Sequence, residues 1–144
     1  MSGLALGHAL SCLFMTGLIW LVQLVHYPAF AHVDAAGFAR FHAFHSERIT
    51  WIVLPVMTIE LATAVLLVAR EGRPWLWNLG GVVLIWAATG LLSVPLHNQL
   101  GAAAPEALPG LIDRLVATNW PRTLLWTVRS AALAYLVITA AARR

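Results

Sequence analysis

Four long runs of apolar residues follow one another along the chain, at about 4–27, 49–69, 75–96 and 120–141. A helix needs about 20 predominantly apolar residues to cross a hydrocarbon layer of about 30 Å, and each run is long enough. The short charged segment 70–74 joins the second run to the third as a tight turn. The pattern therefore predicts an all-α, integral membrane four-helix bundle that forms a single transmembrane domain over residues 1–144.

The other two connections are longer and carry apolar residues at helical spacing. In the first connection the spaced residues are Phe38, Phe41, His42, His45 and Ile49. In the second, apolar residues over 108–116 follow the i, i+3, i+4, i+7 pattern. Such segments are typical of helices that lie on a membrane surface. We therefore expect two short interfacial amphipathic helices on the outer face, with Thr118 or Asn119 as the cap of the fourth span.

Composition supports a membrane protein and excludes several other classes. Hydrophobic residues make up 60% of the chain and charged residues 10%, whereas soluble domains carry about 25% charge. All nine basic residues are Arg and most lie at span ends, so the net charge of +3 does not indicate a nucleic-acid partner. The single cysteine, Cys12, excludes an intrachain disulfide framework. The expected surroundings are a lipid bilayer.

Arginine placement predicts the orientation, because basic residues near span ends favour the cytoplasmic side. One face would hold Arg70, Arg73, Arg143 and Arg144; the other would hold Arg40, Arg48, Arg114 and Arg122. Arg48 and Arg122 begin spans and can point inward, which leaves the first face more basic. We therefore expect a multi-pass protein of a bacterial-type inner membrane, with both termini in the cytoplasm.

Two opposite charges lie deep in the apolar spans. Glu60 is 12 residues beyond Arg48, and Arg129 is 10 residues beyond Asn119, which places them about 18 and 15 Å below the outer surface. A charge at mid-membrane costs at least about 2.5–3.5 kcal/mol, so charges are rarely left alone there. The sequence predicts an ion pair. Either it clamps two helices together or it supplies charge within a binding cavity.

Further polar residues gather in the outer half of the predicted bundle, above this pair. They are Gln23, His26, His45, His97, Asn98, Asn119 and Arg122, whereas the cytoplasmic half offers His8 and little else. Imidazole binds copper, iron and zinc, and haem iron takes axial His ligands. A histidine at a span end can equally be a hydrogen-bonded interfacial residue. Whether His42 or His45 faces inward is left open.

These residues define the expected roles. We expect Glu60, Arg129 and Arg122 to act in catalysis. The expected cofactor-binding residues are His26, His97, Gln23 and Asn119, and the expected metal ligands are His26, His45 and His97. The cofactor would be haem or a transition metal, copper or iron.

Two prolines lie within the outer halves of the spans. Pro55 and Pro95 each free a backbone carbonyl one turn earlier, at Trp51 and Leu91. Such kinks are tolerated where neighbours or water satisfy the carbonyl. They are consistent with a cavity in the outer half, or with ordinary prolines of membrane helices.

Two family resemblances bear on function. The segments Leu21-Val22-Gln23-Leu24-Val25-His26-Tyr27, Glu47-Arg48-Ile49 and Thr118-Asn119-Trp120-Pro121-Arg122-Thr123 resemble the small, b-haem membrane protoporphyrinogen oxidases. The family's functional lysine has no counterpart in this chain. His97-Asn98 and the Asn119-Trp120-Pro121-Arg122 motif resemble the anthrone-oxygenase-like four-helix membrane proteins. Both resemblances imply redox chemistry on a hydrophobic ring compound.

The sequence thus leads to one favoured function and two alternatives. The favoured function is a haem- or metal-dependent membrane oxidoreductase that acts on a small lipophilic substrate. The alternatives are a non-enzymatic module that binds a ligand or metal, and an assembly subunit whose polar cluster is structural. A homo-oligomer is compatible with each.

Overall fold

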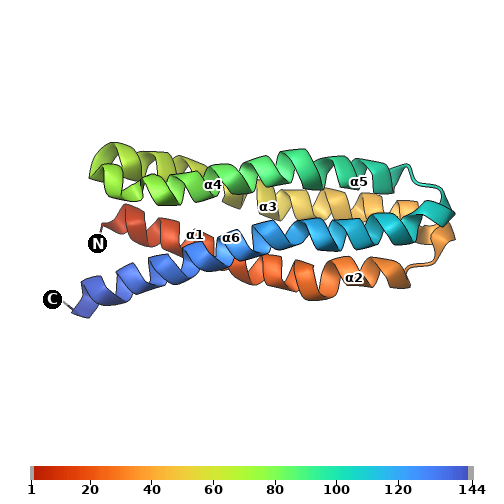
Figure 1. Cartoon of the computed structure of the whole chain (residues 1–144), viewed down its shortest axis with the longest axis horizontal. Helices are drawn as coiled ribbons and strands as arrows, with labels where there is room; N and C mark the ends of the chain where they lie inside the picture. The colour runs from red at the N-terminus through yellow and green to blue at the C-terminus, as the bar shows by residue number, and fades with distance from the viewer. Residues whose placement is uncertain (1, 143–144) are drawn as a thin grey trace.

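Four long helices run up and down to form the whole of the fold (Figure 1). The structure is a computed structural model and describes residues 2–142. The first long helix comprises α1 (Gly3–Leu21), η1 (Val22–His26), α2 (Tyr27–Ala29) and η2 (Phe30–His32). The second is α3 (Ala35–Glu71). The third comprises η3 (Arg73–Trp75), α4 (Leu76–Ala88), η4 (Thr89–Ser93) and α5 (Val94–Gly101), and the fourth η5 (Pro105–Ala107) and α6 (Leu108–Ala142).

The all-α prediction is confirmed, since residues 2–142 contain no strand. All four helices are long and apolar enough to cross a membrane. Their outward faces carry large hydrophobic side chains, of which Trp51 is 72% exposed and Leu91 is 75% exposed. Exposing this apolar surface to water would cost free energy, whereas exposing it to hydrocarbon would not. Arg143 and Arg144, which contributed to the predicted orientation, lie outside the described residues.

The prediction of two separate interfacial helices was wrong. Residues 35–71 form one helix of 37 residues, and α6 runs without a break for 35 residues. The amphipathic segments are the first turns of these helices, because their apolar faces pack on the bundle instead of on a membrane surface. Phe38, His42 and Leu115 are accordingly buried. Asn119 and Thr118 lie inside α6 and do not cap it.

The four helices pack as a square in chain order. The helix that contains α1 packs against α3 and α6, and α4 packs against the same two. Consequently α1 is diagonally opposite α4, and α3 is diagonally opposite α6. The core between them includes Cys12, Met15, Ile85, Trp126 and Leu133. A side chain that joins α3 to α6 must therefore cross the centre of the bundle.

The predicted tight turn after the second span is confirmed. Gly72 alone separates α3 from η3, and its φ is +86°. This left-handed conformation is accessible to glycine without the steric cost that a Cβ imposes. The turn places α3 and α4 side by side as an antiparallel pair.

Two π-helical turns interrupt the first and third long helices. Val22–His26 ends two residues before Pro28, and Thr89–Ser93 ends two residues before Pro95. Proline has no N–H and its ring clashes with the carbonyl four residues earlier, so the helix widens to accommodate it. Pro55 lies within α3 without such a widening. The widened turns change which side chains face inward, and both border the site described next.

Candidate functional site

A buried ion pair crosses the centre of the bundle. Glu60 Oε1 and Arg129 Nη2 are 3.0 Å apart, and the two side chains are 2% and 3% exposed. Glu60 belongs to α3 and Arg129 to α6, which are diagonal neighbours. The predicted pair is therefore present, but it joins opposite helices instead of adjacent ones.

Side chains from all four helices complete the surroundings of this pair. Trp126 Nε1 donates to Glu60 Oε2 at 2.8 Å, and Arg129 Nε donates to Asn78 Oδ1 at 3.2 Å. Asn78 Nδ2 lies 2.8 Å from His8 Nε2, and His8 Nδ1 lies 2.7 Å from Thr63 Oγ1. We call these six residues the central clasp: His8, Glu60, Thr63, Asn78, Trp126 and Arg129.

The hydrogen bonds of the central clasp assign the tautomer of His8. Thr63 Oγ1 donates to the Ile59 carbonyl at 2.6 Å, so it accepts from His8 Nδ1–H. His8 Nε2 then accepts from Asn78 Nδ2 and faces Arg129 Nη2 at 3.3 Å. A neutral His8 fits this arrangement, because both nitrogens have the partner that the tautomer needs.

The half of the bundle near the chain termini is therefore more polar than the sequence suggested. His8 and Asn78 lie near the starts of α1 and α4, and both are fully buried. They engage the ion pair from that side, so Glu60 and Arg129 have polar neighbours on both sides and not only in the half that holds His26, His45 and His97. Each of their charges is enclosed by protein.

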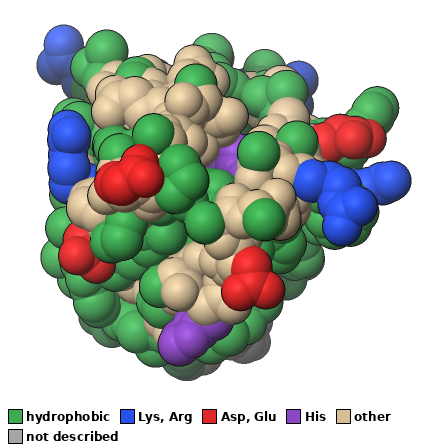
Figure 2. Space-filling model, turned by 90° about the vertical axis from the view of Figure 1, so that its right-hand side faces the viewer, with side chains coloured by type: hydrophobic (Ala, Val, Ile, Leu, Met, Phe, Trp, Pro, Cys, Tyr) green, Lys and Arg blue, Asp and Glu red, His purple; other side chains and the backbone are tan. Residues whose placement is uncertain are grey.

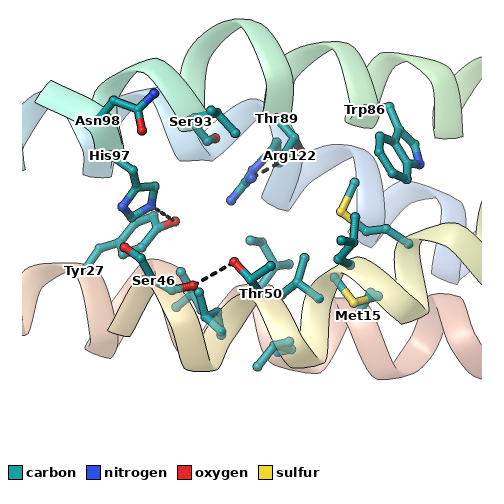
Figure 3. Close-up of a pocket in the computed structure, with 18 of the residues that line it drawn as sticks. Met15, Tyr27, Ser46, Thr50, Trp86, Thr89, Ser93, His97, Asn98 and Arg122 are labelled. Atoms are coloured by element: carbon teal, nitrogen blue, oxygen red, sulfur yellow. Dashed lines mark hydrogen bonds between the residues drawn. The ribbon is translucent and has the colours of Figure 1, made fainter. Parts of the chain in front are cut away.

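A cavity of about 540 Å³ lies on the other side of Trp126, between α3 and the η4–α5 segment (Figure 3). Most of its wall is apolar, contributed by residues such as Met15, Ile19, Val53, Met57 and Trp86. Trp126 lines the cavity while its indole N–H points to Glu60. Neither Glu60 nor Arg129 is among the lining residues, so Trp126 separates the cavity from the ion pair.

The cavity opens sideways, along the gap between α3 and α5. Its lining includes the exposed residues Thr50 and Leu54 of α3 and Val94 and Asn98 of α5. Thr50 and Leu54 lie in the apolar part of the second span, where the outer surface of the bundle would face hydrocarbon. A molecule dissolved in the bilayer could enter here without crossing water.

Arg122 is the charged residue of the cavity wall, and Figure 3 shows its guanidinium directed into the cavity. Its Nε and Nη2 donate to Asn119 Oδ1 at 3.0 and 2.6 Å, and Nη1 donates to Thr89 Oγ1 at 3.2 Å. The side chain is 6% exposed. Within residues 2–142 the only ion pair is Glu60–Arg129, so Arg122 has no carboxylate partner there.

A second layer of hydrogen bonds fixes Arg122. Asn119 Nδ2 donates to Gln23 Oε1 at 2.9 Å, and Gln23 Nε2 donates to the Val116 carbonyl at 3.1 Å. Thr123 Oγ1 also donates to Gln23 Oε1, at 3.2 Å. Gln23 and Asn119, which the sequence placed near a cofactor, instead hold the arginine. Arg122 has five N–H groups, and these three bonds leave one N–H on each Nη outside them.

Four histidines and a tyrosine meet at the outer end of the cavity, and we call them the histidine cluster: His26, Tyr27, His42, His45 and His97. His26 Nε2 is 2.6 Å from His45 Nδ1, and His42 Nε2 is 3.0 Å from His97 Nδ1. His97 Nε2 is 3.0 Å from the Tyr27 hydroxyl (Figure 3). Seen from the connecting-loop end of the molecule, a histidine side chain shows in a recess near the middle of the face, and histidine shows again at its lower edge (Figure 2).

The three expected metal ligands do come together, and His42 joins them. Both His42 and His45 face inward, at 4% and 5% exposed. As positioned, no three His, Cys, Asp or Glu side chains of the described residues form a group that holds a metal ion. His26 does not line the cavity, and both nitrogens of His97 have partners, so these two do not offer a free pair of axial ligands to a haem.

Several residues that line the cavity were not predicted from the sequence. Tyr27, Thr89 and Ser93 lie in or beside the π turns and line the cavity. A regular helical wheel does not predict their direction, since the period changes locally. The prolines at 28 and 95 are the signal that could have found them.

Two polar atoms of the cavity wall have no hydrogen-bond partner in the described part of the chain: Ser46 Oγ and Trp86 Nε1. Leaving a buried donor unsatisfied costs about 1–3 kcal/mol. Both atoms belong to residues that line the cavity.

Comparisons with protein-family models, with curated proteins and with solved structures found no match for this chain.

Replacing Glu60 by Gln should destabilise the protein by about 3–5 kcal/mol, because Arg129 then keeps a buried charge without its counter-charge. The double variant Glu60→Gln, Arg129→Met should recover much of that loss. Unfolding of the detergent-solubilised protein measures both. Glu47→Gln, an exposed change on the same helix, is the control. Equal stability of the single and double variants would show that the pair is not coupled.

Glycine at position 81 should prove necessary for the central clasp. A Cβ built there would lie 2.6 Å from Arg129 Cδ, in a side chain whose far end is held by Glu60 and Asn78. Gly81→Ala should therefore cost about 1–3 kcal/mol of unfolding free energy through overpacking. The matched control is Gly80→Ala, where a Cβ meets nothing within 4 Å. The idea fails if the two alanine variants unfold alike.

Proposed function

We propose that this chain is a membrane protein that binds a small lipophilic ligand carrying an acidic group. The ligand's apolar body would occupy the cavity between α3 and α5, and its acidic group would pair with Arg122. One observation carries the proposal: a buried guanidinium without a carboxylate partner in the described residues faces a mostly apolar cavity.

The free energy of burying a charge supports an anionic partner. Taking an ion out of water costs several kcal/mol unless an opposite charge and hydrogen bonds compensate. Asn119 and Thr89 compensate by neutral hydrogen bonds only. A carboxylate or phosphate would add the missing charge, and the planar guanidinium binds such groups through two N–H bonds.

The apolar wall and sideways opening support a ligand that arrives from the bilayer. The cavity volume of about 540 Å³ falls within the range of small-molecule sites, which is about 300–1,000 Å³. With both termini in the cytoplasm of a bacterial-type inner membrane, as proposed from the arginines, the cavity lies in the outer half. The ligand would then come from the outer leaflet.

A second candidate function is the haem- or metal-dependent oxidoreductase, with copper or iron as the metal. It is favoured by the position of His42 and His97, which line the same cavity. A redox centre there would be next to the ligand, and Arg122 would orient the substrate. An absorption spectrum and metal analysis of gently solubilised protein test this: a protein without a Soret band, metal or turnover is a binding module only.

Arg122→Gln should weaken binding of a fluorescent fatty acid by about 10–100-fold, the range expected when one charge-assisted bidentate pair is lost. Binding of the corresponding methyl ester should change little, because the ester carries no charge for Arg122 to pair with. Titrations of the detergent-solubilised protein measure both. Arg48→Gln, an exposed arginine at the same end, should bind like the native protein.

Equal loss of acid and ester binding would contradict the charge pairing, and unchanged acid binding would contradict the site. Arg122→Lys keeps the charge without the forked donors, so it should bind the acid between the native protein and Arg122→Gln. Circular dichroism of each variant establishes that the bundle is intact.

Filling the cavity should block binding irrespective of charge. Val53→Trp adds an aromatic ring to the α3 wall, so both the fatty acid and its methyl ester should lose affinity together. The control is Val65→Trp, which places the ring on the exposed face of α3 away from the cavity. Retained ester binding in Val53→Trp would place the ligand elsewhere. If no probe binds the native protein, the assembly-subunit alternative gains support.

A further inference from the structure

The histidine cluster includes two histidines, His26 and His45, that do not line the cavity of the proposed ligand site. His45 is buried, does not line the cavity, and its Nε2 has no hydrogen-bond partner within residues 2–142. Three aromatic or imidazole rings surround it, namely Phe30, His26 and His97, with ring centroids 5.0, 4.5 and 5.6 Å away. A buried nitrogen with a free lone pair or N–H is costly unless something binds it.

We propose that His42, His45 and His97 bind a divalent transition-metal ion, Cu²⁺ or Zn²⁺, at the outer end of the cavity. The inferred ligand atoms are His42 Nε2, His45 Nε2 and His97 Nδ1. Three neutral imidazoles without a carboxylate or thiolate are a donor set that suits these ions. This site does not depend on the proposed acid-binding function of Arg122, and it deepens the second candidate function by naming the residues that would hold the metal.

The spacing of the three rings fits one ion. With metal–nitrogen bonds of about 2.0–2.1 Å, the ring centroids of two imidazoles at a tetrahedral ion lie about 5 Å apart. The centroids of His42 and His97 are 5.2 Å apart, those of His45 and His97 5.6 Å, and those of His42 and His45 6.4 Å. Two of the three spacings are thus close to this value, and His45 must move toward His42 for all three rings to reach one ion.

The remaining members of the cluster supply the outer hydrogen bonds that metal-bound histidines use. Tyr27 holds His97 at Nε2, which leaves Nδ1 for the ion, and His26 holds His45 at Nδ1, which leaves Nε2. Such partners fix the tautomer and the orientation of a ligating ring. The roles differ from those the sequence suggested, because His42 takes the place of His26 among the ligands.

Metal binding replaces one hydrogen bond of the cluster. In the structure, His42 Nε2 and His97 Nδ1 lie 3.0 Å apart, so one of the two donates its N–H to the other. Moving one proton to the other nitrogen of its ring gives both atoms a lone pair, with no net gain or loss of protons. Two lone pairs then face one position, where a cation replaces the hydrogen of that bond.

The experiment is a metal titration of the full chain, purified in detergent without a polyhistidine tag and first stripped with a chelator. Separate titrations with Cu²⁺ and Zn²⁺ should give one ion per chain. His42→Gln, His45→Gln and His97→Gln should each weaken binding by at least about 100-fold. His26→Gln, which removes an outer partner, should weaken it by about 10–100-fold.

His32→Gln is the matched control, since His32 is an exposed histidine at the same end of the molecule. It should bind metal like the native protein. Copper bound to the native protein should show coupling to three nitrogens by electron paramagnetic resonance, and to two in His45→Gln. Circular dichroism confirms that the variants are folded.

The proposal is overturned if the stripped protein binds no metal, if the triple His→Gln variant binds as much as the native chain, or if His32→Gln removes binding. Fatty-acid binding is measured separately on the same variants. His45→Gln should bind metal at least about 100-fold more weakly and keep fatty-acid binding, whereas Arg122→Gln should keep metal binding and lose fatty-acid affinity. Loss of both properties in one of these variants would show that the two sites are not independent.

Discussion

The ion pair between Glu60 and Arg129 is the constraint on which the rest of the structure depends. It joins two diagonal helices through the centre of the bundle, so neither charge can reach water while the helices stay packed. In an apolar surrounding, an unpaired charge costs far more than a hydrogen bond contributes. Neighbouring side chains bond most of the polar atoms of the pair, and within residues 2–142 Arg129 Nη1 has no hydrogen-bond partner. His8, Asn78 and Trp126 bring the other contacts. The clasp thus fixes the relative position of all four helices at one level.

The two buried arginines of α6, Arg122 and Arg129, differ in their partners. Arg129 faces a carboxylate, and Trp126 lies between it and the cavity. Arg122 lies about two turns away on α6, is held by neutral amide and hydroxyl groups, and faces the cavity. The central clasp lies on one side of Trp126, and the cavity lies on the other.

The histidine cluster and the cavity both depend on the widened turns. Proline forces η1 and η4 to accommodate an extra residue per turn, and this places Gln23 beneath Asn119 and Thr89 beside Arg122. The sequence shows where each proline lies, but not how its helix accommodates the proline ring. Pro55 is accommodated without a π turn and Pro95 with one. Local widening depends on what packs against the helix, which is a tertiary property.

The sequence by itself determined the four helices, their antiparallel order, the pairing of Glu60 with Arg129, and the gathering of His26, His45 and His97 at one end. These follow from hydrophobic length, from the tight turn at Gly72 and from the cost of burying charge, all of which act along the chain or at matched depth. Only the tertiary structure decided that the amphipathic segments continue α3 and α6, that the ion pair lies beneath Trp126, and that Arg122 alone carries charge into the cavity. Those outcomes depend on which helices are adjacent and which are diagonal, and residue spacing along one chain does not contain that information.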